Sequence, residues 1–229
     1  MRSKLFVMLV LFFSGSVHAQ RARELLELVK AKIEKVNNYT ARGEMKTTVS
    51  FMKVPAAEVK VYFKQPGRVK IVNEKGISLV PKGTVSISLS NLLHGDYQAL
   101  DAGNDVVNGR PVTVINLLPS DQNGEVVLSR LYIDTARALI LLAKTTTRQS
   151  GTNELEMTYG RYAAFALPDK VIFTFSTQDY KLPKGVTFDY DDGSARKKES
   201  PGKENQRGKI EIDYHDYTIN KGLADAVFN

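Results

Sequence analysis

Apolar and polar residues alternate along Glu58 to Val72, EVKVYFKQPGRVKIV, with the two-residue period of a β-strand that buries one face. Pro66-Gly67 interrupts the alternation with a strong turn signal, and the pattern then resumes. The segment therefore predicts two antiparallel strands around a turn, with one apolar face and one cationic face. The apolar residues that follow this alternation are odd-numbered: Val59, Val61, Phe63, Val69 and Ile71.

The rest of the chain repeats this pattern. Two further alternating runs add apolar residues to one face: Val85, Ile87 and Leu89 in the first, and Val171, Phe173 and Phe175 in the second. The run Leu139 to Leu142 is apolar at every position, so we expect this strand to be covered on both faces. Asn108-Gly109 predicts a hairpin turn. The further strands predicted are 39–51, 77–80, 84–89, 106–107, 111–118, 126–133, 138–149, 154–162, 170–178 and 209–219.

One helix precedes these strands, over residues 21–37. A helix of this length is not stable alone in water, so its apolar stripe must pack on the sheet. The stripe consists of Leu25, Leu28, Val29, Ile33 and Val36. Many antiparallel strands, one leading helix and no strand–helix–strand alternation predict an α+β fold that is mainly antiparallel β. We expect a highly curved sheet in the form of an incomplete, half-open β-barrel.

Two stretches break the alternation. In residues 90–105, Ser90 is placed to cap a short helix through Leu92 and Leu93, and the stretch is either a mobile flap over the sheet or an ordinary surface connection. Residues 189–208 are polar, charged and rich in Gly, Pro and Ser, which predicts a mobile loop. The aspartates of this loop miss the spacing of a calcium site, so no metal site is predicted.

The chain begins with the features of a secretory signal peptide. A positively charged start precedes the apolar run Leu5 to Phe13, and Val17-His18-Ala19 fits a cleavage site, which predicts cleavage after Ala19. The run is too short for a membrane anchor, which needs about 20 residues. The chain has no cysteine, so it has no disulfides and no lipid-modified cysteine. We therefore expect residues 1–19 to be removed and residues 20–229 to form a single soluble domain.

The net charge of +7 falls to +5 once Arg2 and Lys4 leave with the signal peptide. We do not expect an exported chain of this charge to bind nucleic acid; attraction to anionic membranes or acidic partners, or solubility alone, accounts for the charge. The chain lacks a thiol nucleophile, a nucleophile elbow and a phosphate loop, and His94 and His215 form no His-x-x-x-His pair. We therefore predict no enzymatic activity, no cofactor and no metal.

Four stretches resemble the LolA-like outer-membrane lipoprotein-sorting proteins. They are NNYTARGEMK after the helix, the strand pair VYFKQPGRVKI, NGRPVTVINLLPSD followed by LYID, and the closing YHDYTINKGLADAVF. The last of these is similar to the end of the Bacteroidetes-type members. The resemblance extends over residues 22–228, as pattern and order more than as identity, and the strand–Lys-x-Pro turn is its most specific part.

The resemblance implies a fold and a function. It implies that helices form a lid over an apolar cavity in a monomeric periplasmic carrier. Such carriers take the acyl chains of lipoproteins from an inner-membrane transporter and deliver them to an outer-membrane acceptor. Related folds serve as periplasmic lipid sensors that contact anti-sigma factors.

The resemblance also assigns residues. Lys64 and Pro66 match residues that flank a lid-latching Arg in the family, and Gln65 stands at that position here. Val69 and Ile71 fall where the family places larger aromatics, which implies a differently shaped pocket. The residues expected to line the acyl-binding cavity are Val59, Val61, Phe63, Gln65, Val69, Ile71, Val85, Ile87, Leu89, Val171, Phe173 and Phe175; those expected in the lid are Leu25, Leu28, Leu92 and Leu93.

Two functions remain open at this point. A wall of alternating apolar residues is required both by a cavity for lipid and by a solid core, so the alternation does not separate them. With a cavity, the protein is a periplasmic carrier or chaperone for lipoprotein acyl chains or lipid. With a solid core, it is a periplasmic sensor or protein-interaction module of the same fold.

Overall fold

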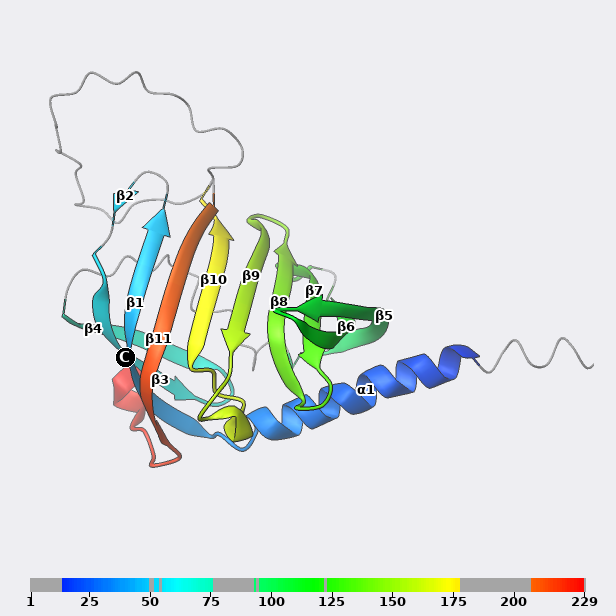
Figure 1. Cartoon of the computed structure of the whole chain (residues 1–229), viewed down its shortest axis with the longest axis horizontal. Coiled ribbons are helices and arrows are strands. Elements are labelled where there is room, and N and C mark those ends of the chain that lie inside the picture. The colour runs from blue at the N-terminus through cyan, green and yellow to red at the C-terminus, as the bar shows by residue number, and fades with distance from the viewer. Residues whose placement is uncertain are drawn as a thin grey trace, which may run out of the picture.

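A computed structural model describes residues 14–49, 52–53, 55–75, 93, 95–121, 123–177 and 207–228 (Figure 1). These residues form helix α1 (Ser14–Ile33), eleven strands, and the short 3-10 helices η2 (Ala163–Phe165) and η4 (Asp225–Phe228). The strands are β1 (Asn38–Val49), β2 (Met52–Lys53), β3 (Ala57–Lys64), β4 (Arg68–Lys75), β5 (Tyr97–Val107), β6 (Arg110–Pro119), β7 (Val126–Asp134), β8 (Leu139–Thr147), β9 (Gly151–Thr158), β10 (Lys170–Ser176) and β11 (Arg207–Ile219).

All of these strands belong to one antiparallel sheet. Its order is β4-β3-β1-β11-β10-β9-β8-β7-β6-β5, and β2 pairs beside β1. Strand β11 inserts between β1 and β10, so strands from the two ends of the chain meet inside the sheet. In Figure 1 the strands turn from the steep β1 and β10 to the nearly horizontal β5, so the sheet is strongly curved. Within the described residues the sheet does not close, which confirms an open, mainly antiparallel sheet with one N-terminal helix.

The two predicted hairpins are confirmed. Strands β3 and β4 pair around the Pro66-Gly67 turn, with Val61 opposite Ile71 and Phe63 opposite Val69. Strands β5 and β6 pair around Asn108 and Gly109, whose φ angles of 50° and 74° are those of a tight hairpin turn.

Helix α1 ends at Ile33, four residues before the predicted end. The helix ends there because side chains of residues distant in the sequence donate hydrogen bonds to the backbone carbonyls that follow Ile33. The Gln65 side-chain amide donates to the Val36 carbonyl (3.0 Å), and the Asn220 amide donates to the Lys35 carbonyl (2.7 Å). These bonds satisfy carbonyls that a further helical turn would otherwise have to bond, so the chain turns directly into β1.

Helix α1 packs on one half of the sheet, as its apolar stripe required. Leu28 is an exception, because it is 61% exposed, and Leu26 packs in its place. We call the buried set beneath the helix the helix-covered cluster: Ala22, Leu25, Leu26, Val29, Leu93, Ile115, Leu117, Leu131, Ile133, Ile140, Ala143 and Met157.

The same half of the sheet is also covered on its other face. Leu139 and Leu141 point away from α1 into a second buried group that includes Val112 and Val114, while Ile140 points toward the helix. This arrangement confirms that the Leu139 to Leu142 strand is buried on both sides.

The other half of the sheet forms a separate buried group, which contains no residue of α1. We call it the helix-free cluster: Ala41, Met45, Val49, Ala57, Val59, Val61, Phe173, Phe175, Ile210 and Ile212. Its members come from β1, β3, β10 and β11, which the sheet order places side by side.

Two predictions about irregular stretches were wrong in part. Residues 97–105, expected in a flap or surface connection, belong to strand β5, because they pair with β6 across a bulged register. Strand β11 starts at Arg207, inside the predicted loop 189–208. The predicted strands 77–80 and 84–89, with Val85, Ile87 and Leu89, lie outside the described residues. Leu92 and residues 189–206 of the predicted loop also lie outside the described residues.

Candidate functional site

The sheet order brings together the apolar residues that were expected to line a cavity. Val59 and Val61 on β3 lie in the same cluster as Phe173 and Phe175 on β10, although more than a hundred residues separate them. Val69 and Ile71, from β4, are half-buried and pack against this cluster. The curved sheet therefore assembles a continuous apolar face from distant segments.

The face is continuous with the helix-covered half. Leu155, from β9, packs against both clusters, and Val171, expected in the cavity wall, packs against the helix-covered cluster. On β10, Phe173 and Phe175 stack with ring centroids 5.6 Å apart. The Phe175 ring lies over Gly208, where a Cβ atom would come within 2.4 Å of it. Gly208 thus lets an aromatic ring lie flat against the sheet.

An aromatic group closes one end of this face. Phe63 is buried with Val36 and Leu167, and its ring stacks on Tyr39 at 5.1 Å. Tyr217 makes an edge contact with Tyr39 at 5.3 Å, and its hydroxyl donates to the Pro168 carbonyl at 2.7 Å. Burial raises the pKa of Tyr39 and of Tyr217 far above the ordinary value, so this end of the face is uncharged.

A polar row crosses the same side of the sheet under β7, β8 and β9. Asn153 alternates with Leu155 and therefore shares its face, and the sheet register places Asn153 beside Thr145 and Thr145 beside Ser129. All three are buried, and the Ser129 and Thr145 hydroxyls are hydrogen-bonded at 3.3 Å. The Asn153 carbonyl oxygen and the Thr47 hydroxyl are buried without a hydrogen-bond partner. This row was not predicted from the sequence. Polar residues at the alternating, buried positions of β8 and β9 could have indicated it.

The opposite face of the sheet carries charge of both signs. On β11, Glu211 points away from the apolar cluster and pairs with Lys170 and with Lys209 (3.0 Å). Hydrogen bonds from these two lysines hold the pKa of Glu211 below its usual value. The outer face is therefore a network of ion pairs, more balanced in charge than the cationic pattern of β3 and β4 suggested.

Gln65, which stands at the sequence position expected to latch a lid, contacts the segment that follows the helix. Its backbone N–H donates to the Asn37 carbonyl at 2.9 Å, in addition to the side-chain bond to Val36. Gln65 therefore fastens the β3–β4 turn to the segment between α1 and β1. The described residues that were expected to form a lid do not belong to the helix-free cluster. Leu25 and Leu93 are buried in the helix-covered cluster, and Leu28 is exposed.

The C-terminal segment is attached to the same β3–β4 hairpin. Lys64 and Arg68 both pair with Asp225, at 3.0 and 2.6 Å, and the Arg68 guanidinium lies 4.5 Å above the Phe228 ring. Phe228 and Asp225 thus hold the C-terminal segment against the β3–β4 hairpin.

The described residues show no arrangement for metal chemistry. They contain no group of three or more His, Asp or Glu residues positioned to hold a metal ion, and His215 is exposed. Among the same residues, no helix combines the length and the apolar character needed to cross a bilayer. The chemistry that the described face offers is therefore apolar contact with a few buried polar groups.

Comparison with known proteins identifies the fold. No family profile and no curated protein matches the sequence. Solved structures do match: an outer membrane lipoprotein-sorting protein domain from Vibrio parahaemolyticus has 13% identity and a TM-score of 0.60, covering 92% of this chain and 97% of that one. A DUF1329 family protein from Desulfovibrio piger has 11% identity and a TM-score of 0.58, covering 93% and 97%. A LolA superfamily protein from Nitrosomonas europaea has 12% identity and a TM-score of 0.56, covering 91% and 97%.

These three likenesses span nearly the whole length of each chain at low identity, so they concern the fold. The chain has a LolA-like fold, as its sequence stretches predicted.

Proposed function

We propose that this protein is a periplasmic carrier that binds lipoprotein acyl chains or lipid on the apolar face of its sheet and moves them toward the outer membrane. The observation that carries the proposal is the helix-free cluster, a continuous apolar face built by β1, β3, β10 and β11 and not covered by α1. The LolA-like fold supports it, since one protein of similar fold is named for the sorting of outer membrane lipoproteins.

The energetics of an acyl chain support a protein-bound route. Each exposed CH₂ group costs about 0.8 kcal/mol in water, so a sixteen-carbon chain carries a cost on the order of 10 kcal/mol. An apolar face removes most of this cost. Binding must also be reversible in a carrier, and a face of Val, Ile and Phe with uncharged tyrosines at one end offers apolar contact without fixed charge.

The remaining parts of the proposal rest on the family resemblance of the sequence. We propose that Val85, Ile87 and Leu89 complete the wall, with Gln65 at its edge, and that Leu25, Leu28, Leu92 and Leu93 belong to a movable lid. Cleavage after Ala19 would release a soluble domain of residues 20–229 into the periplasm. The partners would be an inner-membrane transporter and an outer-membrane acceptor, and the protein would perform no catalysis.

Native mass spectrometry and uptake of a fluorescent fatty acid test the proposal. Protein purified from a bacterial host should carry lipid-sized ligands and take up the fatty acid. Phe173→Asp should abolish uptake, because a carboxylate in the helix-free cluster is incompatible with an acyl chain. Phe165→Asp is the matched control, since Phe165 is exposed on η2 and should leave uptake unchanged. Consistently bare protein that takes up no fatty acid would rule the carrier out.

The second candidate is a periplasmic sensor or interaction module. It is favoured by the burial of the helix-free cluster in the structure itself, where Val59 and Val61 are only 1% and 2% exposed. A face that is already buried is also the property of a solid core. A pulldown that yields one stoichiometric protein partner and no lipid would support this candidate over the carrier.

A further inference from the structure

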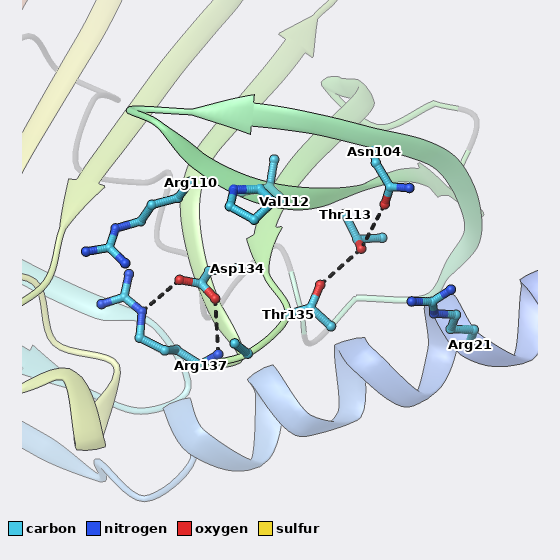
Figure 2. Close-up of a pocket in the computed structure, with 10 residues that line it drawn as sticks. Arg21, Asn104, Arg110, Val112, Thr113, Asp134, Thr135 and Arg137 are labelled. Atoms are coloured by element: carbon cyan, nitrogen blue, oxygen red, sulfur yellow. Dashed lines mark hydrogen bonds and ion pairs between the residues drawn. The ribbon is translucent and has the colours of Figure 1, made fainter.

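A pocket lies outside the apolar face, on the helix-covered half of the molecule. Its volume is about 430 Å³, within the range of about 300–1,000 Å³ typical of small-molecule sites. Figure 2 shows it between α1, the β5–β6 hairpin and the turn that joins β7 to β8. Pro111 and Val112 form its apolar wall.

Three arginines from three separate elements line this pocket. Arg21 extends from α1, Arg110 begins β6, and Arg137 belongs to the β7–β8 turn. Asp134 is the one acidic residue of the lining. The pocket therefore has an excess of two positive charges at neutral pH.

Asp134 is already engaged by Arg137. It is 6% exposed, and it accepts hydrogen bonds from the Arg137 Nε (2.7 Å) and the Arg137 backbone N–H (3.1 Å). Burial by itself would raise the pKa of Asp134, but the bonds from Arg137 and the charges of Arg137 and Arg110 hold it below its usual value. The side chains of Arg21 and Arg110 form neither a hydrogen bond nor an ion pair with any described residue, so their guanidinium groups remain available to a ligand.

Uncharged polar side chains, hydrogen-bonded to one another, also line the pocket. An irregularity in β5 between Asp101 and Asn104 turns Asn104 toward β6, where its side-chain oxygen accepts from the Thr113 hydroxyl at 3.4 Å. The Thr113 and Thr135 hydroxyls lie 3.0 Å apart. Figure 2 shows this chain of polar side chains running from β5 to the β7–β8 turn, on the side of the pocket nearer Arg21.

We propose that this pocket binds a phosphate-bearing anion, either the head group of an anionic phospholipid or free phosphate. Each guanidinium presents five N–H donors in a planar fork that matches two phosphate oxygens at once. The Arg110 guanidinium and the remaining N–H groups of the Arg137 guanidinium, which lie beside each other in Figure 2, supply more donors than a carboxylate can accept, whereas a phosphate offers several strong acceptor oxygens; Arg21 adds positive charge at the other end of the pocket. The site is separate from the helix-free cluster, so it does not depend on acyl binding.

A charge-matched pair of variants tests the proposal on the full chain as the host processes it. Arg21→Gln with Arg110→Gln removes both available arginines of the pocket. Arg42→Gln with Arg130→Gln is the control, because both residues are exposed and lie outside the pocket, Arg42 paired with Asp216 (3.1 Å) and Arg130 bonded to Asn116 (3.0 Å). Thermal unfolding of all three proteins confirms that the folds are intact.

Binding is measured in two arms. The first titrates inorganic phosphate and follows NMR shifts; the second measures co-sedimentation with vesicles of phosphatidylcholine alone or mixed with phosphatidylglycerol. The pocket variant should bind about tenfold or more weakly than wild type, since losing a charge-assisted hydrogen bond to the anion costs about a tenfold factor, and the control should match wild type. A selective loss in the vesicle arm identifies a lipid head group, and a loss confined to the phosphate arm identifies free phosphate. Equal binding by the three proteins in both arms, or no binding by wild type in either, would overturn the proposal.

Discussion

The two halves of the sheet bury their apolar residues by different means. In the helix-covered half, α1 supplies Ala22, Leu25, Leu26 and Val29 to a cluster whose strand residues are mostly Leu and Ile. In the helix-free half, the described members of the cluster are all strand residues, and Val, Ala, Ile and Phe predominate. The helix therefore fills one half with its own side chains, whereas the described members of the other cluster come from strands alone.

This comparison also separates residues that the sequence grouped together. The predicted wall residues Val59, Val61 and Phe173 lie in the helix-free cluster, whereas the predicted lid residues Leu25 and Leu93 lie in the helix-covered cluster. A lid made of α1 would have to leave its own cluster to reach the wall. In the structure, α1 packs on the helix-covered half and contributes no residue to the helix-free cluster.

The largest expected effect comes from the contact between helix and sheet. Leu26→Ala should reduce the free energy of unfolding by about 3 kcal/mol, because it removes a buried side chain and leaves a cavity. Leu28→Ala, on the same helix but 61% exposed, should change it by less than about 0.5 kcal/mol. Urea denaturation measures both. Equal losses would mean that α1 is not anchored as the structure shows.

Val→Thr substitutions compare the two halves directly. Val29→Thr places a hydroxyl in the helix-covered cluster and should cost about 2 kcal/mol of stability, because it replaces a buried methyl group by a hydroxyl whose nearby acceptor is a carbonyl of the preceding helical turn, already bonded within α1. Val61→Thr makes the same change in the helix-free cluster; it should cost less stability and should weaken fatty-acid binding about tenfold. Urea denaturation and a fluorescence titration measure the two effects. Equal stability losses with unchanged fatty-acid binding would show that both clusters are solid cores.

Two contacts hold the β7–β8 turn. Asp134 accepts hydrogen bonds from Arg137, and Lys32 of α1 donates to the Arg137 carbonyl at 2.6 Å. Asp134→Asn should cost about 1.5 kcal/mol at neutral pH, because it weakens a charge-assisted hydrogen bond. The pKa of Asp134 is lower in the folded protein than in the unfolded chain. Its contribution is therefore present above the ordinary carboxyl range and is lost as the pH falls through the folded pKa.

The difference between wild type and Asp134→Asn should accordingly shrink below about pH 4. Stability measured by urea denaturation across pH tests this. The exposed Asp216, which pairs with Arg42, is the control, and Asp216→Asn should cost less than about 0.5 kcal/mol. A difference at Asp134 that stayed constant with pH would contradict the ion pair as its source.

Gln65 joins the two halves and should give the smallest effect. Gln65→Ala removes the side-chain hydrogen bond to the Val36 carbonyl and should cost about 1 kcal/mol. Amide hydrogen exchange should increase at the end of α1, around residues 34–37, and stay unchanged in β7 and β8. Gln98→Ala, at an exposed position of β5, should alter neither stability nor exchange. Faster exchange throughout the helix would instead mean that Gln65 supports α1 as a whole.

The strand pattern was predictable because burial follows the two-residue period closely. Val59, Val61 and Phe63 are buried at the alternating positions that the sequence marked, and Leu139 to Leu142 is buried on both faces. Residues 97–105 were not recognised as a strand, because β5 is an edge strand in which most side chains face water and the alternation is weak.

The details of the site depended on contacts between distant residues. The end of α1 is set by Gln65 and Asn220, which no helical periodicity reveals. Leu26 and Leu28 are equally apolar, and only the direction in which the helix faces the sheet selects Leu26. The arginine pocket combines Arg21, Arg110 and Arg137 from three elements, so only the folded chain brings them together.

The irregularity in β5 also affects how the protein behaves at high concentration. Among the described strands, β4 and β5 form the two rims of the open sheet, and a regular exposed rim invites strand addition by another molecule and, in time, fibre formation. At the β5 rim, Gly103 with a φ of 90° and the skipped register at Asp101 break the row of N–H and C=O groups that a foreign strand would need. At the β4 rim, Arg68 holds the C-terminal η4 against the strand. Within the described residues, each rim of the open sheet is thus blunted by its own backbone or tail, which hinders strand addition by another molecule.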